Sequence, residues 1–154
     1  MSQAARSQPF KIIGEGQGHQ WTVLGDHQTI KLTGADTQGR FTLIEQFMEP
    51  GTAIPMHVHD FEDEVFQILE GELSCSIGDQ LFMLGPGDTV FAPRRVPHGF
   101  QVVGDQPART SLMVFPAGIE DMFELLSQLP AGRPDFNKVM DICGKFGVRF
   151  LPPE

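Results

Sequence analysis

Short apolar segments alternate with glycine- and proline-containing turns between residues 20 and 116. In ELSCSIG the apolar residues Leu73, Cys75 and Ile77 fall on one face of a strand, and the polar residues between them fall on the other. The pattern predicts strands at Trp21–Leu24, Thr29–Thr33, Phe41–Met48, Glu64–Leu69, Glu72–Ile77, Leu81–Leu84, Thr89–Ala92, His98–Val103 and Thr110–Phe115. Strands that recur about every ten residues are typical of an all-β sandwich, jelly roll or barrel.

The periodicity changes to a helical one after Pro116. Apolar residues recur at helical spacing in GIEDMFELLSQL, residues 118–129, and Pro130 ends the segment. Asp135 is a candidate N-cap for a second helix over FNKVMDIC, residues 136–143. We expect both helices to pack on the outside of the β body.

The chain of 154 residues is expected to form a single domain over residues 1–154. Its barrel core would cover about 20–116 and its C-terminal helical tail about 117–154. The net charge of -9 argues against a nucleic-acid partner. No apolar run approaches the ~20 residues of a membrane span, and the first residues carry no secretory signal. Two cysteines make no disulfide framework, so we expect a cytoplasmic protein.

The segment from Gly51 to Gly71, GTAIPMHVHDFEDEVFQILEG, concentrates imidazole and carboxylate groups. Alternate side chains of a strand share a face, so His57 and His59 project together. Glu64 begins the next strand, and neighbouring strands lie about 4.8 Å apart. Two nitrogens and one oxygen that converge in this way suit a zinc or non-haem iron ion.

His98 is the candidate fourth ligand, because it begins a strand after a proline-containing turn. His19 and His27 lie in polar, turn-like surroundings and are interpreted as surface residues. The alternative for any single histidine is a solvated position near a strand end. Glu62 and Asp63 could compete with Glu64 as ligands, but we interpret them as a solvated acidic turn.

The fixed positions Gly51, His57, His59, Glu64 and Gly71 resemble the first motif of the cupin superfamily. The second cupin motif is matched in part, by Gly87, Pro93 and His98. Arg95 stands where the family usually has glycine, and Val102 stands where it often has asparagine.

The resemblance implies a double-stranded β-helix, the cupin jelly-roll barrel, in a small single-domain bacterial cupin similar to quercetin dioxygenase-like proteins. It implies a divalent transition metal on His57, His59, Glu64 and His98. Iron is the leading candidate, and manganese, nickel, copper and zinc are the alternatives. The family also commonly forms homodimers, which exposed strand edges and apolar helices would favour.

The residues expected beside the metal are apolar. If Glu64 points inward, so do Phe66 and Ile68, and if His98 does, so do Phe100 and Val102. The chain has 13 Phe and no Tyr. Such a pocket favours an apolar or aromatic ligand over a sugar, which needs many hydrogen-bond partners.

Three functions are compatible with these residues. The first is a metal-dependent dioxygenase acting with molecular oxygen on a small aromatic enol or hydroxy compound, with Glu64 as the catalytic proton acceptor. The second is a metal-dependent isomerase, decarboxylase or lyase, for which Arg94, Arg95 and Arg109 are the candidate clamp for an acidic substrate. The third is a small-molecule-binding cupin without catalysis.

Overall fold

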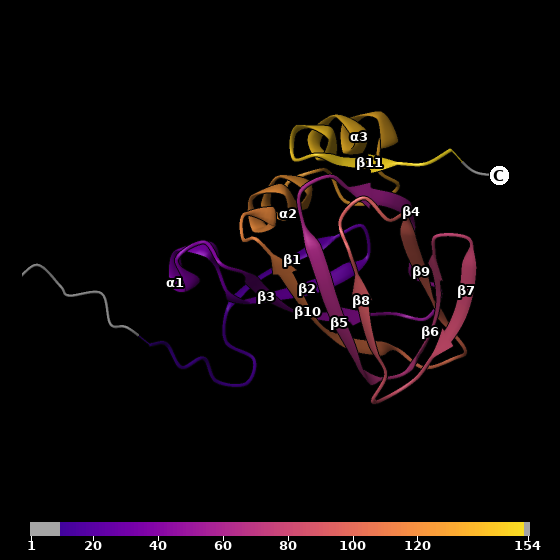
Figure 1. Cartoon of the computed structure of the whole chain (residues 1–154), viewed down its shortest axis with the longest axis horizontal. Coiled ribbons are helices and arrows are strands. Elements are labelled where there is room, and N and C mark those ends of the chain that lie inside the picture. Colours follow the sequence, from indigo (N-terminus) through magenta and orange to yellow (C-terminus); the bar gives the residue numbers. More distant parts are fainter. Residues whose placement is uncertain (1–9, 153–154) are drawn as a thin grey trace, which may run out of the picture.

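Two antiparallel sheets face each other in the computed structural model, which describes residues 10–152 (Figure 1). Residues 1–9, the start of the stretch in which the sequence shows no secretory signal, lie outside the described residues. The strands and helices in chain order are β1 His19–Val23, β2 Asp26–Leu32, α1 Gly34–Thr37, β3 Thr42–Met48, β4 Ala53–His59, β5 Asp63–Glu70, β6 Glu72–Ile77, β7 Gln80–Leu84, β8 Thr89–Ala92, β9 His98–Val103, β10 Ala108–Phe115, α2 Ile119–Ser127, α3 Phe136–Lys145 and β11 Val148–Phe150.

The six-stranded sheet has the order β1-β2-β3-β10-β5-β8, and the five-stranded sheet has the order β11-β4-β9-β6-β7. After β3 the chain passes back and forth between the sheets, except at the hairpin of β6 and β7, which both lie in the five-stranded sheet. This is the arrangement of a double-stranded β-helix. The predicted fold class is therefore confirmed. Each of the nine predicted strands is present, with ends that shift by at most three residues.

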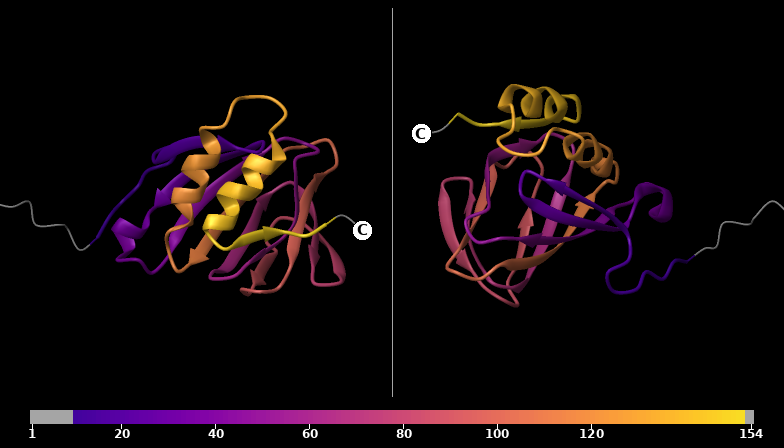
Figure 2. Two further views of the ribbon diagram at one scale, coloured as in Figure 1. Left: turned by 90° about the horizontal axis from the view of Figure 1, so that it is seen from above. Right: turned by 180° about the vertical axis from the view of Figure 1, so that it is seen from behind.

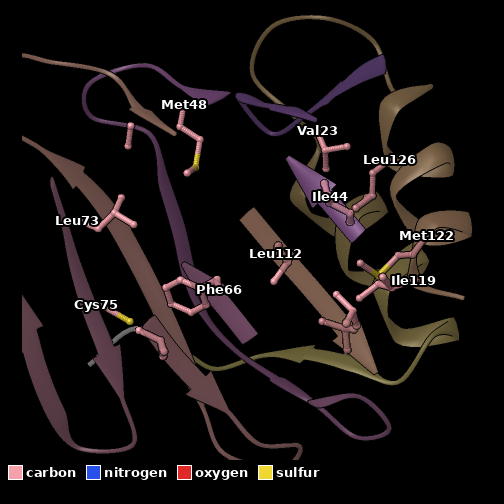
Figure 3. Close-up of a cluster of buried hydrophobic side chains, with 14 of the residues drawn as sticks. Val23, Ile44, Met48, Phe66, Leu73, Cys75, Leu112, Ile119, Met122 and Leu126 are labelled. Carbon is pink, nitrogen blue, oxygen red and sulfur yellow. The ribbon is translucent and has the colours of Figure 1, made fainter. Parts of the chain in front are cut away.

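The interior between the sheets is filled by alternate side chains of each strand. In β10, Ala108, Thr110, Leu112 and Val114 are buried, and the residues between them are partly exposed. The apolar members of this interior continue from the sheets to the first helix after the barrel, as Figure 3 shows for Phe66, Leu112 and Met122. One hydrophobic core therefore joins the barrel to its C-terminal segment.

Both C-terminal helices lie over one end of the barrel, and the views of Figure 2 agree on this. Ile119, Met122 and Leu126 form the buried face of α2. The predicted N-cap of α3 is confirmed, because the side chain of Asp135 accepts a hydrogen bond from the backbone N–H of Asn137 at 3.1 Å. The expectation that these helices only cover the outside was incomplete, since they close an open end of the barrel.

Strand β11 was not predicted from the sequence. It has three residues, too few to show a periodicity, and it forms by pairing with the edge of β4, where Val148 lies opposite His59 and Phe150 opposite His57. The chain end thus covers the strand that carries two of the candidate ligands. No helix in the described part of the chain has the length and apolar character that a bilayer crossing requires.

Two positions where the cupin motifs have glycine adopt a left-handed backbone conformation. Gly71 has φ 82°, and a Cβ there would lie 2.5 Å from the carbonyl oxygen of Pro107. Arg95, at the position where cupins usually have glycine, also takes a left-handed conformation, with φ 68°. The departure from the motif therefore keeps the turn and places strain on a non-glycine residue.

Candidate metal centre

The three histidines of the motifs meet on two neighbouring strands. His57 of β4 lies directly opposite His98 of β9, and their ring centroids are 4.4 Å apart. His59 follows two residues later on the same face, with its ring centroid 5.0 Å from that of His57 and 5.5 Å from that of His98. One ring nitrogen from each lies within 4.8 Å of the others, and all three side chains are buried. The predicted convergence of the imidazoles is present.

Close contact between these strands depends on the residue after His98. A Cβ on Gly99 would lie 2.9 Å from the carbonyl oxygen of Ile54 on β4. Glycine therefore lets β9 approach β4 where the two strands carry their histidines.

Glu64 reaches the histidines from the facing sheet. Its Oε2 lies 2.9 Å from Nε2 of His98, and its Oε1 lies 3.3 Å from Nε2 of His59. The prediction that Glu64 lies on a strand next to that of the histidines is wrong, because β4 and β5 belong to different sheets. Residues 60–62 cross between the sheets, so the carboxylate approaches the imidazoles through the interior.

An outer acceptor fixes the orientation of each imidazole. In every case Nδ1 faces an oxygen that accepts its hydrogen bond: Pro55 O at 2.8 Å from His57, Glu62 Oε2 at 3.3 Å from His59, and Val96 O at 3.3 Å from His98. With Nδ1 protonated, Nε2 carries the free lone pair. Partners of this kind also hold metal-binding histidines in other proteins.

Glu62 is one of these outer partners, and its interpretation as part of a solvated turn was wrong. The residue is only 9% exposed. Asp63 behaves differently, since it is partly exposed and pairs with Arg94, whose backbone N–H donates to its Oδ1 at 2.8 Å. Glu62 therefore belongs to the metal centre, and Asp63 lies at the surface.

Charge at the centre is concentrated on Glu64. Burial opposes ionisation, but the imidazoles of His59, His98 and His57 outweigh it and hold the pKa of Glu64 at about 2. Burial, together with the charges of the other two histidines, lowers the pKa of His57 to about 4. For His59, Glu64 and Glu62 outweigh burial and raise the pKa. An ionised carboxylate therefore faces at least one neutral imidazole.

The donor set fits a divalent transition metal. Nε2 of His59 is buried and makes no well-aligned hydrogen bond among the described residues, because the nearby Oε1 of Glu64, 3.3 Å away, is not placed to accept one. Burial of such an unsatisfied polar atom is costly. Three imidazole nitrogens and one carboxylate oxygen are ligands that zinc, iron and related ions accept. A cation at the point where these atoms converge would satisfy the unpaired nitrogen.

A cavity extends from the histidines into the barrel. It is lined by all four candidate ligands and by Phe66 and Phe100 of the predicted pocket. Ile68 and Val102, the other two predicted pocket residues, are buried in the core and do not line the cavity. The cavity has a volume of about 80 Å³, several times the ~10–15 Å³ that one water needs. The cavity therefore has room for a compact ligand.

The C-terminal segment also contributes to the cavity. Met122 and Phe123 of α2 and Phe150 of β11 line it, and the ring centroid of Phe150 lies 5.9 Å from that of His57. Sequence reasoning missed these residues. The apolar face of the first predicted helix was the available signal, but the sequence did not show which end of the barrel it would cover.

The arginines considered for an acidic substrate lie away from the cavity. Arg94 pairs with Asp63, and Arg109 lies 3.7 Å from Glu70 at the surface. None of the residues that line the cavity is arginine or lysine. The lining therefore offers no cationic clamp for a carboxylate or phosphate.

The comparisons with known proteins agree with one another. A family model described as Cupin domain matches residues 44–115, from β3 to the end of β10. The chain is similar to quercetin 2,3-dioxygenase of Bacillus subtilis (strain 168), with 25% identity over 104 residues that make up 68% of this chain and 30% of that protein. It is also similar to the polyketide synthase CurC of Streptomyces cyaneus, with 34% identity over 68 residues, 44% of this chain and 42% of that protein.

This chain matches less than half of the length of either relative. Among solved structures, the polyketide cyclase RemF from Streptomyces resistomycificus resembles it with a TM-score of 0.59 and 26% identity, over 69% of this chain and 79% of that one. Residues 44–115, which the family model matches, contain all four candidate ligands.

Proposed function

Because this chain is a small member of the cupin family, we propose that His57, His59, Glu64 and His98 hold a divalent transition metal. Iron is the leading candidate, and manganese, nickel, copper and zinc are the alternatives. The unpaired, buried Nε2 of His59 at the point of convergence is the observation that carries the proposal. The outer acceptors at each Nδ1 support it, because a neutral imidazole with its proton on Nδ1 has the lone pair of Nε2 for a metal.

The reaction that we propose is oxygenation of a small apolar or aromatic enol or hydroxy compound by molecular oxygen. The similarity to quercetin 2,3-dioxygenase and the apolar side chains along the cavity support it. A bound metal would supply Lewis-acid stabilisation of negative charge on the substrate oxygen. Glu64, ionised and beside that position, would accept the proton of the substrate hydroxyl. Phe66 and Phe100 would pack against the apolar part of the substrate.

Oxygen consumption tests this reaction. Metal-loaded protein should consume oxygen with some members of a panel of hydroxyaromatic and enol compounds, and Glu64→Gln should lower the rate by about 10²–10⁴. Glu72→Gln makes the same change on an exposed residue and should leave the rate unchanged. No turnover across the panel with several metals would contradict the proposal.

A second candidate is non-oxidative chemistry on the same centre, as in an isomerase, decarboxylase or lyase. The similarity to proteins named polyketide synthase CurC and polyketide cyclase RemF favours it, because neither name describes an oxidation. Product formation without oxygen consumption would support this candidate over the dioxygenase. Tight retention of a ligand without any turnover would instead support a binding protein.

We also propose that the protein acts as a single-domain homodimer in the cytoplasm. β7, at the edge of the five-stranded sheet, exposes Leu81, Phe82 and Met83, which are 69%, 43% and 65% exposed. Exposed apolar residues on an edge strand favour association with another chain. Light scattering of the purified protein should give the mass of two chains, and a monomer at all concentrations would contradict it.

A further inference from the structure

The cavity has a second polar group that the metal centre does not use. It consists of Asp26, Gln28, Gln46 and Thr110, which line the cavity from β2, β3 and β10. We call these four residues the Asp26 cluster. All four are buried, at positions where the alternation of their strands directs side chains inward. Polar residues at such positions need a reason, because apolar ones would fill the core at lower cost.

Strand register places the Asp26 cluster away from the histidines. Glu64 on β5 lies opposite Val114 on β10, Phe66 lies opposite Leu112, and the next inward residue of β10 is Thr110. Thr110 lies opposite Gln46, which lies opposite Gln28. An apolar row with Phe66 and Leu112 therefore separates the Glu64 row from the row of Thr110, Gln46 and Gln28, which is four residues away along β10, or about 13 Å. The backbone of Asp26 lies one inward position further, opposite Met48.

Hydrogen bonds hold the cluster in one arrangement. Oδ2 of Asp26 accepts from Nε2 of Gln28 at 3.0 Å and from Nε2 of Gln46 at 2.6 Å. The amide oxygens have partners as well, since Trp21 Nε1 donates to Gln28 at 2.9 Å and the Thr110 hydroxyl donates to Gln46 at 2.7 Å. Oδ1 of Asp26 is the exception. It is buried and has no hydrogen-bond partner among the described residues, in a side chain that is 3% exposed.

We propose that Oδ1 of Asp26 accepts a hydrogen bond from a hydroxyl group of the ligand, at the end of the cavity remote from the metal centre. This inference rests on the proposed function and narrows its substrate class. The ligand would have one oxygen at the histidines, an apolar middle beside Phe66 and Leu112, and a second hydroxyl at Asp26. A compact aromatic compound with hydroxyls at opposite ends meets this description.

The electrostatics of Asp26 favour such a donor. Burial raises the pKa of Asp26 to about 6, although the hydrogen bonds from Gln28 and Gln46 and the charge of His27 oppose the rise. At higher pH the group is a carboxylate whose Oδ1 lacks a donor, and a ligand hydroxyl would supply one. An ammonium group would leave further N–H donors beside the apolar row, so a hydroxyl, with one donor, matches the site better.

Matched pairs of probes test the inference by titration calorimetry on the metal-loaded full chain. Each pair compares a compound with hydroxyls at opposite ends with its single-hydroxyl analogue: hydroquinone with phenol, a naphthalenediol with the matching naphthol, and a dihydroxybiphenyl with the hydroxybiphenyl. The three pairs span increasing lengths. For the pair that fits the cavity, the wild type should bind the two-hydroxyl compound about tenfold more tightly. Trp21, the single tryptophan, donates to the cluster, so its fluorescence should change only with that compound.

Asp26→Asn should remove this preference while leaving the affinity for the single-hydroxyl probe unchanged. Gln46→Met, which removes one donor to Oδ2, should reduce the preference and provides a second variant if the first fails to fold. Asp105→Asn makes the same change as Asp26→Asn at an exposed turn and should keep the wild-type preference. Thermal unfolding of each variant checks that it is folded.

The outcomes separate the inference from the proposed function. His98→Ala should weaken both members of a pair, whereas Asp26→Asn should weaken only the two-hydroxyl compound. If metal fails to strengthen binding but Asp26→Asn still removes the preference, the metal centre is contradicted and the hydroxyl site stands. A wild type without preference for any two-hydroxyl probe, a preference that survives in Asp26→Asn, or a failure of all probes to bind would overturn the inference.

Discussion

Replacement of Asp26 by asparagine should raise the free energy of unfolding near neutral pH. In the folded protein burial raises the pKa of this carboxyl to about 6, whereas in the unfolded chain it returns to 3.8. Between these values the folded protein holds a proton that the unfolded chain has released. The free energy of unfolding therefore falls as the pH rises through this interval, and above it the fold carries the full cost of the buried carboxylate.

The size of this increase in the free energy of unfolding follows from the pKa shift of Asp26. A difference of about two pKa units corresponds to roughly 3 kcal/mol. Asparagine has the same shape, can accept from both glutamines through its oxygen, and cannot ionise. The free energy of unfolding of Asp26→Asn should therefore exceed that of the wild type by up to about 3 kcal/mol near pH 8. This difference should shrink toward zero near pH 4.

Urea denaturation at a series of pH values measures this difference directly. Asp105 lies at an exposed turn, so Asp105→Asn should have the same free energy of unfolding as the wild type at every pH. If Asp26→Asn were no more stable than the wild type near pH 8, or if the difference were independent of pH, the assignment of a costly buried carboxylate would be refuted. A stability gain together with loss of the hydroxyl preference would show that binding, and not folding, requires this residue.

Three further substitutions have defined outcomes. Glu62→Gln weakens the acceptor for Nδ1 of His59 and should lower the metal affinity about 10–100-fold in a chelator competition. Glu72 is exposed, so Glu72→Gln should leave the metal affinity unchanged. Phe150→Ala should lower the free energy of unfolding by about 2 kcal/mol, because Phe150 packs against the core. Phe91 is 60% exposed, so Phe91→Ala should lower it less. Equal effects of the two substitutions would contradict the role of β11 in closing the barrel. Arg95→Gly should raise the free energy of unfolding by up to about 1 kcal/mol through release of left-handed strain, and a loss would contradict that reading.

Local patterns were sufficient to predict an all-β body and the shared face of two histidines. Alternating strands with glycine turns indicated a sandwich, jelly roll or barrel, and a spacing of two residues placed His57 and His59 on one face. The resemblance to the cupin motifs, and not the alternation, implied the double-stranded β-helix. His98 followed from its position at the start of a strand, and the structure places it directly opposite His57. These predictions succeeded because strand periodicity depends only on neighbouring residues.

The features that the sequence did not reveal depend on long-range pairing. Glu64 was assigned to the wrong sheet, since hydrophobic alternation does not show which strands pair. Glu62 was placed at the surface because an acidic run is usually solvated, whereas its contact with His59 buries it. The Asp26 cluster joins the neighbouring strands β2 and β3 to β10, which is distant in sequence, and only their register brings Asp26 and Thr110 into one network. Polar residues at inward positions were the one available signal.

Elemental analysis of the purified protein tests whether the three histidines and Glu64 hold a metal. We expect a stoichiometric amount of a divalent transition metal in the wild type and its loss in His57→Ala. His19→Ala removes an exposed histidine outside the centre and should retain the metal. A wild type that binds no transition metal when supplied with iron, manganese, nickel, copper or zinc, or a His57→Ala variant that binds as much as the wild type, would contradict the account.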